Sequence, residues 1–276
     1  MHKTVVLNYR FWTNSLSQYA QQTKKRFGQH FLHDRGVIER MLRALSLSPT
    51  DRVVEIGPGS GALTFPLLER LNHLDIVEID RDVISWWQQQ TPAQGKLSIH
   101  AQDALKLDIP RLRGAGEPLR VIGNLPYNIS TPLLFHLLEY GSDIRDMLFM
   151  LQKEVVDRIT AEPDSSDYGR LSVMMQYFCA TSYLMKVGPG AFNPPPKVDS
   201  AVVYLKPWVS LPYTAHHLAT FSQLVAQAFS QRRKTLRNTL KGLVSTEQME
   251  SVGIDPSRRA ETLAVKDFVQ LANLIS

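Results

Sequence analysis

Four consecutive residues, Asn124 to Tyr127, combine groups that suit the recognition of a flat aromatic amine. The amide oxygen of Asn124 can accept a hydrogen bond from an exocyclic amine, and Tyr127 offers a face for stacking. Pro126 fixes one backbone dihedral and keeps Leu125 extended, so that the Leu125 carbonyl can project into a pocket. Together these groups suit adenine or cytosine taken out of its stack. An ordinary strand-to-helix turn, with Asn124 as a cap and Tyr127 in the core, fits the same four residues.

A glycine-rich stretch, residues 57–61, follows an apolar run and precedes a helical pattern. This order of strand, glycine turn and helix is typical of the first unit of a doubly wound nucleotide-binding fold, in which glycine lets the backbone approach the ligand. Gly57, Gly59 and Ala62 satisfy the relaxed dinucleotide pattern, so the loop alone does not separate NAD from S-adenosylmethionine. A purely structural turn is the third possibility.

Acidic residues follow the next two expected strands. The strand over residues 74–79 contains Glu78 and is followed by Asp80, and an acid about twenty residues beyond the glycines can bind ribose hydroxyls. One of these two carboxylates could instead serve only as a helix cap. Asp103 follows the strand over residues 97–100 and can accept from an adenine amino group, although an N-cap role fits its position equally well.

An aromatic residue lies on a proline-rich rim between the last two expected strands. Phe192 precedes three consecutive prolines, residues 194–196, which are too rigid for a helix. Its ring could stack on a base opposite Tyr127, and inward packing is the alternative.

Alternating strand and helix patterns predict the elements that position these residues. A helix is expected over residues 34–47, and strands over 52–56, 74–79, 97–100, 119–122, 146–151, 183–187 and 201–205. This order predicts an α/β, doubly wound, Rossmann-like sheet that binds a nucleotide-containing cofactor. After Trp208 only helical periodicity continues. We therefore expect an N-terminal extension over residues 1–22, a catalytic domain over 23–207 and an all-α domain over 208–276.

Basic residues gather in two places. Lys24, Lys25 and Arg26 form the first cluster. The second cluster lies within the expected C-terminal domain: Arg232, Arg233, Lys234, Arg237 and Lys241. An apolar stripe of Val225, Phe229, Leu236 and Leu240 predicts that this second cluster lies on one amphipathic helix. Unopposed basic residues suit phosphate-backbone binding, and a solvated face is the plainer interpretation.

Composition limits the function classes. The 276 residues carry a formal net charge of +5, and 43% are hydrophobic, which favours a globular protein with an anionic partner. The single cysteine, Cys179, excludes an internal disulfide framework. The eight histidines show no metal-ligand spacing. No apolar run is long enough to span a bilayer, and residues 1–22 lack the apolar core of a secretory signal.

The motifs taken together resemble the ribosomal RNA adenine dimethyltransferase family, most closely its bacterial small-subunit branch. Nine stretches carry the resemblance, in order: residues 25–32, 54–59, 78–80, 102–104, 123–132, 152–155, 168–172, 192–200 and 231–234. Each could arise by chance, whereas the ordered set over residues 24–276 is specific.

The resemblance implies S-adenosyl-L-methionine as cofactor and assigns roles to single positions. The implied cofactor contacts are His30, Leu32, Gly57, Glu78, Asp103 and Asn124. It favours Glu78 over Asp80 as the carboxylate that binds the ribose hydroxyls. It places His30 and Leu32 over the methionine end of the cofactor, although the family commonly has asparagine at the position of His30. The catalytic residues become Asn124, Leu125, Pro126, Tyr127 and Phe192, and no metal is required.

The implied reaction is dimethylation of N6 of two adjacent adenosines in a hairpin near the 3′ end of small-subunit (16S) rRNA. The expected partner is this rRNA within an assembling 30S-type particle, contacted by Lys24, Lys25, Arg26, Arg232, Arg233, Lys234 and Arg237. We expect a cytoplasmic monomer without a membrane partner. Three alternatives remain: an NAD-dependent oxidoreductase, a non-catalytic RNA-binding or ribosome-assembly factor, and an N6-adenine DNA methyltransferase.

Overall fold

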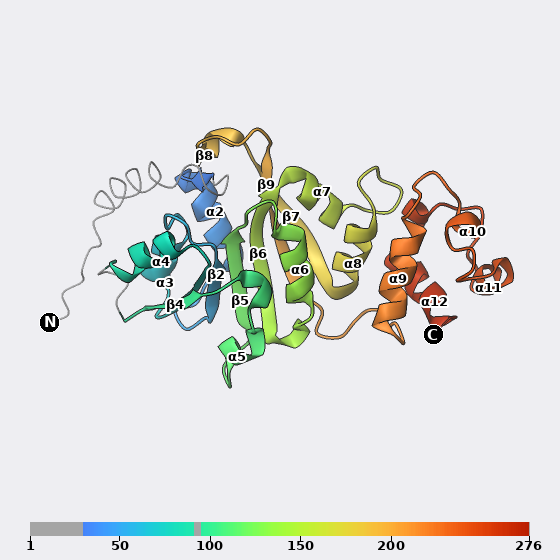
Figure 1. Ribbon diagram of the computed structural model, residues 1–276, viewed down its shortest axis with the longest axis horizontal. Coiled ribbons are helices and arrows are strands. Elements are labelled where there is room, and N and C mark those ends of the chain that lie inside the picture. The colour runs from blue at the N-terminus through green and yellow to red at the C-terminus, as the bar shows by residue number, and fades with distance from the viewer. Residues whose placement is uncertain (1–29, 91–94, 276) are drawn as a thin grey trace. The chain divides into compact units, whose positions relative to one another are not determined.

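The computed structural model describes residues 30–90 and 95–275 (Figure 1). Contacts divide them into two compact units, one from Met1–Lys153 with Leu184–Tyr204 and one from Glu154–Tyr183 with Leu205–Ser276, each described as far as the structure places it. The predicted boundary after residue 207 lies three residues beyond the last crossing between the units. Residues 154–183, expected in the catalytic domain, belong to the second unit, because their helix α8 (Arg170–Phe178) contacts α9 (Leu218–Ala228) and α12 (Val265–Asn273).

A seven-stranded sheet runs through the described residues in the order β4-β3-β2-β5-β6-β9-β7. The strands are β2 (Val53–Ile56), β3 (Leu74–Glu78), β4 (Leu97–Ala101), β5 (Leu119–Asn124), β6 (Ile144–Gln152), β7 (Cys179–Val187) and β9 (Ser200–Pro207). The neighbours from β4 to β6 pair in parallel. The order reverses between β2 and β5, and ligands of such sheets bind outside the carboxyl ends of the strands at this switch point.

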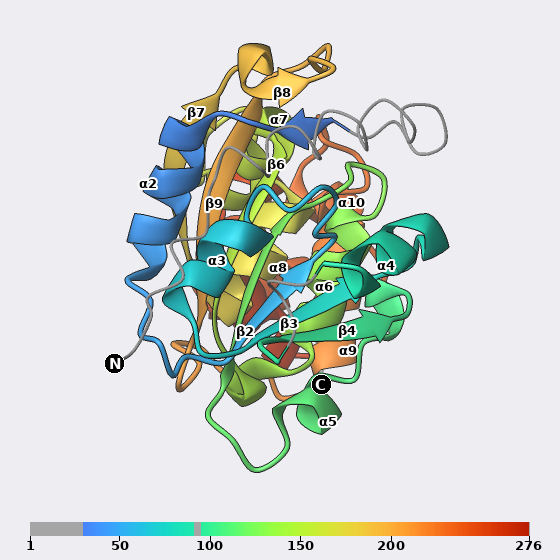
Figure 2. The same ribbon diagram turned by 90° about the vertical axis from the view of Figure 1, so that its left-hand side faces the viewer.

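Short helices connect the strands of the first unit. They are α2 (Arg35–Leu45), α3 (Thr64–Arg70), α4 (Arg81–Gln88), α5 (Ile109–Arg113) and α6 (Ser130–Leu138), with 3₁₀ turns η2 (Ala104–Lys106), η3 (Gly141–Asp143) and η4 (Pro189–Ala191). In α2, Asp34 caps the first turn by accepting from Val37 N, and the predicted helix over residues 34–47 is confirmed. Helices α2 and α6 lie on opposite faces of the sheet (Figure 2), so β2 and β3 are buried along their whole length.

A two-stranded ladder joins the beginning of the described chain to the proline-rich rim. Strand β1 (Phe31–Leu32) pairs antiparallel with β8 (Phe192–Asn193), with Phe31 opposite Asn193 and Leu32 opposite Phe192. The sequence pattern did not predict this ladder, because two residues carry no detectable period.

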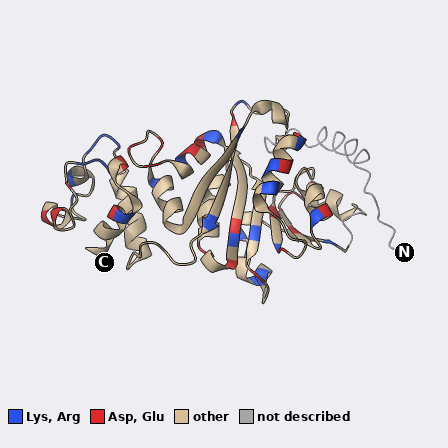
Figure 3. Ribbon diagram, turned by 180° about the vertical axis from the view of Figure 1, so that it is seen from behind, with Lys and Arg blue, Asp and Glu red and all other residues tan. Residues whose placement is uncertain are grey.

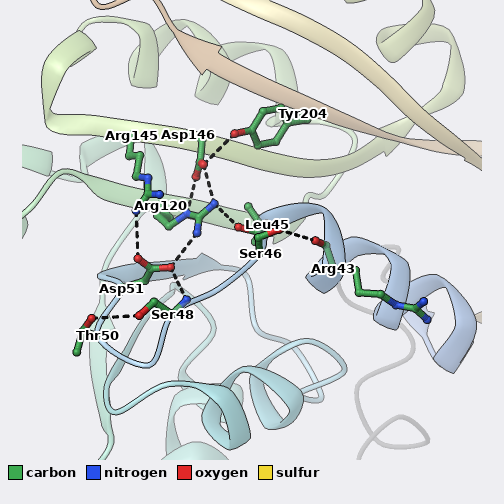
Figure 4. A network of polar contacts seen from close by, with 10 residues as sticks. All are labelled: Arg43, Leu45, Ser46, Ser48, Thr50, Asp51, Arg120, Arg145, Asp146 and Tyr204. Carbon is green, nitrogen blue, oxygen red and sulfur yellow. Dashed lines mark hydrogen bonds and ion pairs between the residues drawn. The ribbon is translucent and has the colours of Figure 1, made fainter.

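The amino-terminal ends of β5 and β6 hold a buried ion network (Figure 4). Arg120, which is 3% exposed, binds both oxygens of Asp146 at 2.9 and 2.7 Å, Asp51 at 2.8 Å and the Leu45 carbonyl at 2.5 Å. Burial alone would raise the pKa of Asp51, but hydrogen bonds from Ser48 and Arg120 hold this pKa below its usual value. Paired and fully bonded charges of this kind are stable inside a protein, so the network closes this end of the sheet.

Helices dominate the second unit. They are α7 (Lys153–Thr160), which begins one residue before the unit, then α8, α9, α10 (Leu236–Thr239), α11 (Thr246–Ser251), the 3₁₀ turn η5 (Ala260–Thr262) and α12. The fully buried rings of Phe221 and Phe268 lie in its core. In the described residues after β9 the named elements are all helical, as expected for the C-terminal part.

The prediction that the basic cluster lies on one helix is wrong. Helix α9 ends at Ala228, and Arg232, Arg233 and Lys234 lie on the link to α10. The backbone N–H groups of Leu236 and Arg237 donate to the carbonyls of Arg258 and Pro256 rather than to the preceding helical turn. Pairing with this distant segment therefore interrupts the helix.

Across residues 30–90 and 95–275, no helix is long and apolar enough to cross a membrane.

Candidate active site

The glycine loop between β2 and α3 leaves an open space at its first residue. Gly57 has a φ of +68°, which side-chain-bearing residues rarely adopt, and no described atom lies within 4 Å of the place where its Cβ would be. The Gly57 N–H donates to Val77 O at 3.0 Å and so fixes the loop to the end of β3. A ligand can therefore approach the backbone at Gly57 without meeting a side chain.

Glu78 and Asp80 have different roles at the end of β3. Glu78 is 8% exposed, and its Oε1 accepts from the N–H groups of Ile79 and Asp80 at 2.8 and 2.9 Å. Burial raises the pKa of Glu78, and these two bonds oppose the rise. Because both bonds use Oε1, Oε2 keeps its capacity to accept from a ligand hydroxyl. Asp80 caps α4 by accepting from Asp82 N at 2.9 Å, which is the capping alternative foreseen for one of the pair.

Asp103 lies at the end of β4 and caps η2. Its Oδ1 accepts from Leu105 N at 2.9 Å, so the predicted capping role is present. The carboxylate is partly exposed and retains a second oxygen for a ligand. Capping and ligand binding are therefore compatible at this position.

Two residues beside these acids were not singled out by the sequence patterns. Ile79 is 62% exposed directly after Glu78, where an apolar side chain can cover one face of a flat ligand. Glu55, in β2, is 2% exposed, and its Oε2 has no hydrogen-bond partner among the described residues. Burial, and secondarily the nearby charge of Glu78, raises the pKa of Glu55 to about 8, opposed by Thr64. The position of Glu55 two residues before the glycine loop was the available signal.

Asn124 lies at the end of β5, directly beside the glycine loop. A Cβ at Gly123 would lie 2.7 Å from the Ile56 carbonyl, so only glycine allows β5 to approach β2 this closely. The Asn124 Nδ2 donates to the His30 carbonyl at 3.4 Å. A carbonyl can only accept, which fixes the orientation of the amide, and Oδ1 has no partner among the described residues. The acceptor that an amine requires is therefore free.

The three residues after Asn124 hold a rigid turn. The Leu125 N–H donates to Met150 O at 3.1 Å, and the Leu125 side chain is buried. The exposed Pro126 accepts at its carbonyl from Ile129 N at 3.2 Å. The hydroxyls of Tyr127 and Ser200 are hydrogen-bonded at 3.1 Å, and Tyr127 is half-buried.

The ring of His30 lies near that of Tyr127. Its Nδ1 and the Pro194 carbonyl are 2.7 Å apart, and its ring centroid lies 6.4 Å from that of Tyr127 with an interplanar angle of 30°. Leu32 is 4% exposed and packs in the core, so only its backbone is available to a cofactor.

Phe192 does not occupy the position expected of it. It is 3% exposed, faces Leu32 in the β1–β8 ladder and belongs to the hydrophobic core. The apolar ring gains more by burial under the rim than by exposure above it. The ring opposite Tyr127 in this structure is His30, and the stacking role expected for Phe192 is not supported.

Figure 3 colours the basic and acidic residues along the ribbon, and both kinds occur in the second unit. The basic cluster is therefore not entirely without acidic partners. Arg232 is ion-paired with Glu261 at 3.2 Å and also donates to the Ser166 carbonyl. Arg233, Lys234 and Arg237 are exposed. Lys24, Lys25 and Arg26 lie outside the described residues. No group of three or more potential metal-binding side chains occurs in the part of the chain that the structure describes.

Comparisons with known proteins agree on one family. The model of the family described as ribosomal RNA adenine dimethylase matches residues 20–276. The chain is 57% identical to a ribosomal RNA small subunit methyltransferase A of Alcanivorax borkumensis, over 92% of this chain and 90% of the relative. It is 54% identical to the protein of that name from Pseudomonas fluorescens, over 94% and 96%.

Solved structures share the fold. A dimethyladenosine transferase from Plasmodium falciparum matches with a TM-score of 0.74 at 28% identity, over 88% of this chain and 96% of that one. The 23S rRNA methyltransferase ErmE matches with a TM-score of 0.69 at 23% identity, over 89% and 99%, and shows the fold alone.

Proposed function

The chain belongs to the ribosomal RNA adenine dimethylase family, and from this premise we propose how its pocket acts and on which nucleotides. It is an S-adenosylmethionine-dependent enzyme that dimethylates adenine in small-subunit rRNA. Its targets are N6 of two adjacent adenosines in a hairpin near the 3′ end of that rRNA. The observation that carries the proposal is the free amide oxygen of Asn124 beside the open glycine loop.

The residues at the carboxyl ends of β2, β3 and β4 fit S-adenosylmethionine. The open space at Gly57 lets the cofactor approach the protein backbone. Glu78 Oε2 accepts from the ribose hydroxyls, and Asp103 accepts from the adenine amine. The backbone of His30 and Leu32 covers the methionine end. When bound, the cofactor supplies an electrophilic methyl group on a sulfonium.

Asn124 and Leu125 prepare the target amine. The lone pair of adenine N6 is delocalised into the ring, so the nitrogen is a poor nucleophile. Hydrogen bonds from N6 to Asn124 Oδ1 and to the Leu125 carbonyl favour a pyramidal nitrogen with a localised lone pair. Positive charge then develops on N6, where the two acceptor dipoles stabilise it. Holding both reactants in line supplies much of the remaining acceleration.

The base is captured outside its helix. Tyr127 offers one stacking face at the rim, fixed by its bond to Ser200. Arg232, Arg233, Lys234 and Arg237, together with Lys24, Lys25 and Arg26, contact phosphates of the rRNA. We place the enzyme, as a monomer, on an assembling 30S-type particle in the bacterial cytoplasm.

Labelled cofactor offered in parallel with three substrates tests this function. Unmethylated small-subunit particles, protein-free rRNA and duplex DNA would be incubated with the enzyme, and labelled nucleotides identified. We expect N6,N6-dimethyladenosine at two adjacent positions in rRNA from the particles. Labelling of DNA alone, or of a position away from the 3′ hairpin, would contradict the proposal.

The basic cluster is tested through salt dependence. Each phosphate contact adds about one to the slope of log affinity against log salt. Replacing Arg233 and Lys234 with alanine should reduce that slope for particle binding by about two. Arg232→Ala should change it less, because Glu261 already pairs with Arg232. Cofactor affinity, measured in the same variants, should not change. An unchanged salt slope would indicate that the cluster is only a solvated surface.

A further inference from the structure

Three aromatic rings surround the glycine loop between β2 and α3. Phe65 lies in α3, directly after the loop, and Trp87 lies in α4. A Cβ at Gly61 would lie 2.5 and 2.8 Å from ring atoms of Phe65 and 3.0 Å from a ring atom of Trp87. A Cβ at Gly59 would lie 3.6 Å from the ring of Phe31 in β1. The loop backbone is therefore packed directly against these rings, without room for a side chain at Gly61.

Trp87 also holds the loop through a hydrogen bond. Its Nε1 donates to the Gly59 carbonyl at 3.1 Å, and the residue is 1% exposed. The indole nitrogen can only donate, and a buried donor without an acceptor is costly. The rings of Phe65 and Trp86 pack against the indole, with centroids 5.1 and 4.9 Å from that of Trp87. A donor fixed by packing therefore binds one carbonyl of the loop.

Helix α4 connects this hydrogen bond to the carboxylate at the end of β3. The helix begins at Arg81, shortly after Glu78, and Trp87 lies in its last turn. At its other end the loop is bonded to β3 itself, because the Gly57 N–H donates to Val77 O. The glycine loop is thus tied at two points to the strand and helix that flank Glu78, and these ties set its position relative to that carboxylate.

We propose that Trp87 is a positioning residue, which holds the glycine loop in its ligand-binding conformation in the cofactor-free protein. The inference rests on the function proposed above, in which this loop and Glu78 bind S-adenosylmethionine. Gly59 and Gly61 have φ angles of +49° and +91°, and glycine has many other conformations open to it. When only a fraction of the molecules holds the competent conformation, the apparent dissociation constant rises in inverse proportion to that fraction. The indole bond keeps this fraction high.

Removal of the indole donor tests this role. Trp87→benzothienylalanine replaces the N–H group by sulfur and keeps both rings, whereas Trp87→Phe removes the donor with a natural side chain. In both variants we expect S-adenosylmethionine to bind about tenfold more weakly in calorimetric titrations. KM for the cofactor should rise by the same factor. The kcat at saturating cofactor should stay within about twofold of wild type, because the loop is ordered once the site is filled.

Amide hydrogen exchange measures the loop without cofactor. The Gly61 N–H donates to Pro58 O across the loop, so its exchange reports how often the loop opens. In the cofactor-free Trp87 variants this exchange should be faster by about tenfold or more, and the amides of β5 should keep wild-type rates. The matched control is Trp208→Phe, which removes an indole bond to the Gln176 carbonyl in the second unit. It should change neither the exchange of Gly61 nor the cofactor affinity.

Three results would overturn the proposal. The first is wild-type cofactor affinity in Trp87→benzothienylalanine. The second is a lower kcat at unchanged KM in the Trp87 variants, which would indicate a smaller fraction of folded enzyme rather than a displaced loop. The third is an equal loss of cofactor affinity in Trp208→Phe. Absence of S-adenosylmethionine binding by the wild type would instead contradict the proposed function itself.

Discussion

The two ends of strand β5 differ in how completely their polar side chains are hydrogen-bonded. At its start Arg120 is buried with every partner in place: Asp51, Asp146 and the Leu45 carbonyl. At its end Asn124 makes one bond of 3.4 Å and keeps its amide oxygen free, while the neighbouring Glu55 has a buried oxygen without any described partner. In a completed network every charge already has its partners, so a ligand has nothing to bind. Buried acceptors without a hydrogen-bond donor lower the stability of the fold, and a ligand can supply the missing donor.

The largest effect is expected at the closed end. Arg120→Ala leaves Asp51 and Asp146 buried without their cation, which typically costs about 3–5 kcal/mol of stability. Chemical unfolding measures the loss. Arg145→Ala is the matched control, because it removes an arginine from the same Asp51 but one whose side chain is 57% exposed, and it should cost less than about 1 kcal/mol. Equal losses of unfolding free energy in the two variants would show that the buried ion pairs matter no more than the exposed one.

Asn124→Ala should reverse the pattern, with little change in stability and a large loss of rate. Removing one preorganised partner of a developing charge costs about 2.7–4 kcal/mol, a hundred- to thousandfold in the chemical step. Single-turnover methylation of saturating particles isolates that step. Particle affinity should barely move, and Asn128→Ala, an exposed asparagine four residues on, should behave as wild type. A near-wild-type rate for Asn124→Ala would reduce this residue to a turn cap.

Glu78 and Asp80 allow two neighbouring carboxylates at the ligand-binding end of the sheet to be compared. Glu78→Ala should weaken S-adenosylmethionine binding by about 1–3 kcal/mol, because a charge-assisted bond to the ligand is lost. Asp80→Ala removes the cap of α4, so it should cost about 0.5–2 kcal/mol in stability and little in cofactor affinity. Calorimetric titration of both variants decides between the two acids, and the reverse order would contradict the assignment.

The last expected effect is a dependence of stability on pH at Glu55. Its pKa is raised from 4.5 to about 8 by burial, so the folded chain keeps a proton that the unfolded chain loses. Stability contributed by this group therefore falls as pH rises from about 4.5 to 8 and levels off above that range. The melting temperature of Glu55→Gln should rise relative to wild type across this window. Glu69→Gln, at an exposed position of α3, should show no such trend.

Periodic elements were predictable from the sequence, and contacts between distant segments were not. The strands and helix α2 appeared where buried side chains recur at a fixed spacing. Arg120 lay inside a run that looked apolar, and its carboxylate partners lie 69 and 26 residues away along the chain. The basic helix was predicted because Phe229 and Leu236 are spaced as in a helix, whereas residues 235–237 pair with residues 256–259.

At the site, residue types were more informative than orientations. The motifs singled out Asn124, Tyr127, Glu78 and Asp103, and the structure places each at or shortly after the end of a strand that the pattern located. Their roles stay predictions. The motifs could not show that Phe192 turns inward while His30 faces Tyr127. That outcome depends on the β1–β8 ladder, which joins segments of the chain too short to carry a signal.

The same ladder joins parts of the chain that are synthesised at different times. His30 and Pro194 are separated by 164 residues, and chains emerge at about 5–20 residues per second. For several seconds a nascent chain therefore contains the glycine loop and Asn124 but not the β8 segment that pairs with β1. A chain cut short before residue 192 keeps the residues expected to bind the cofactor and lacks this ladder.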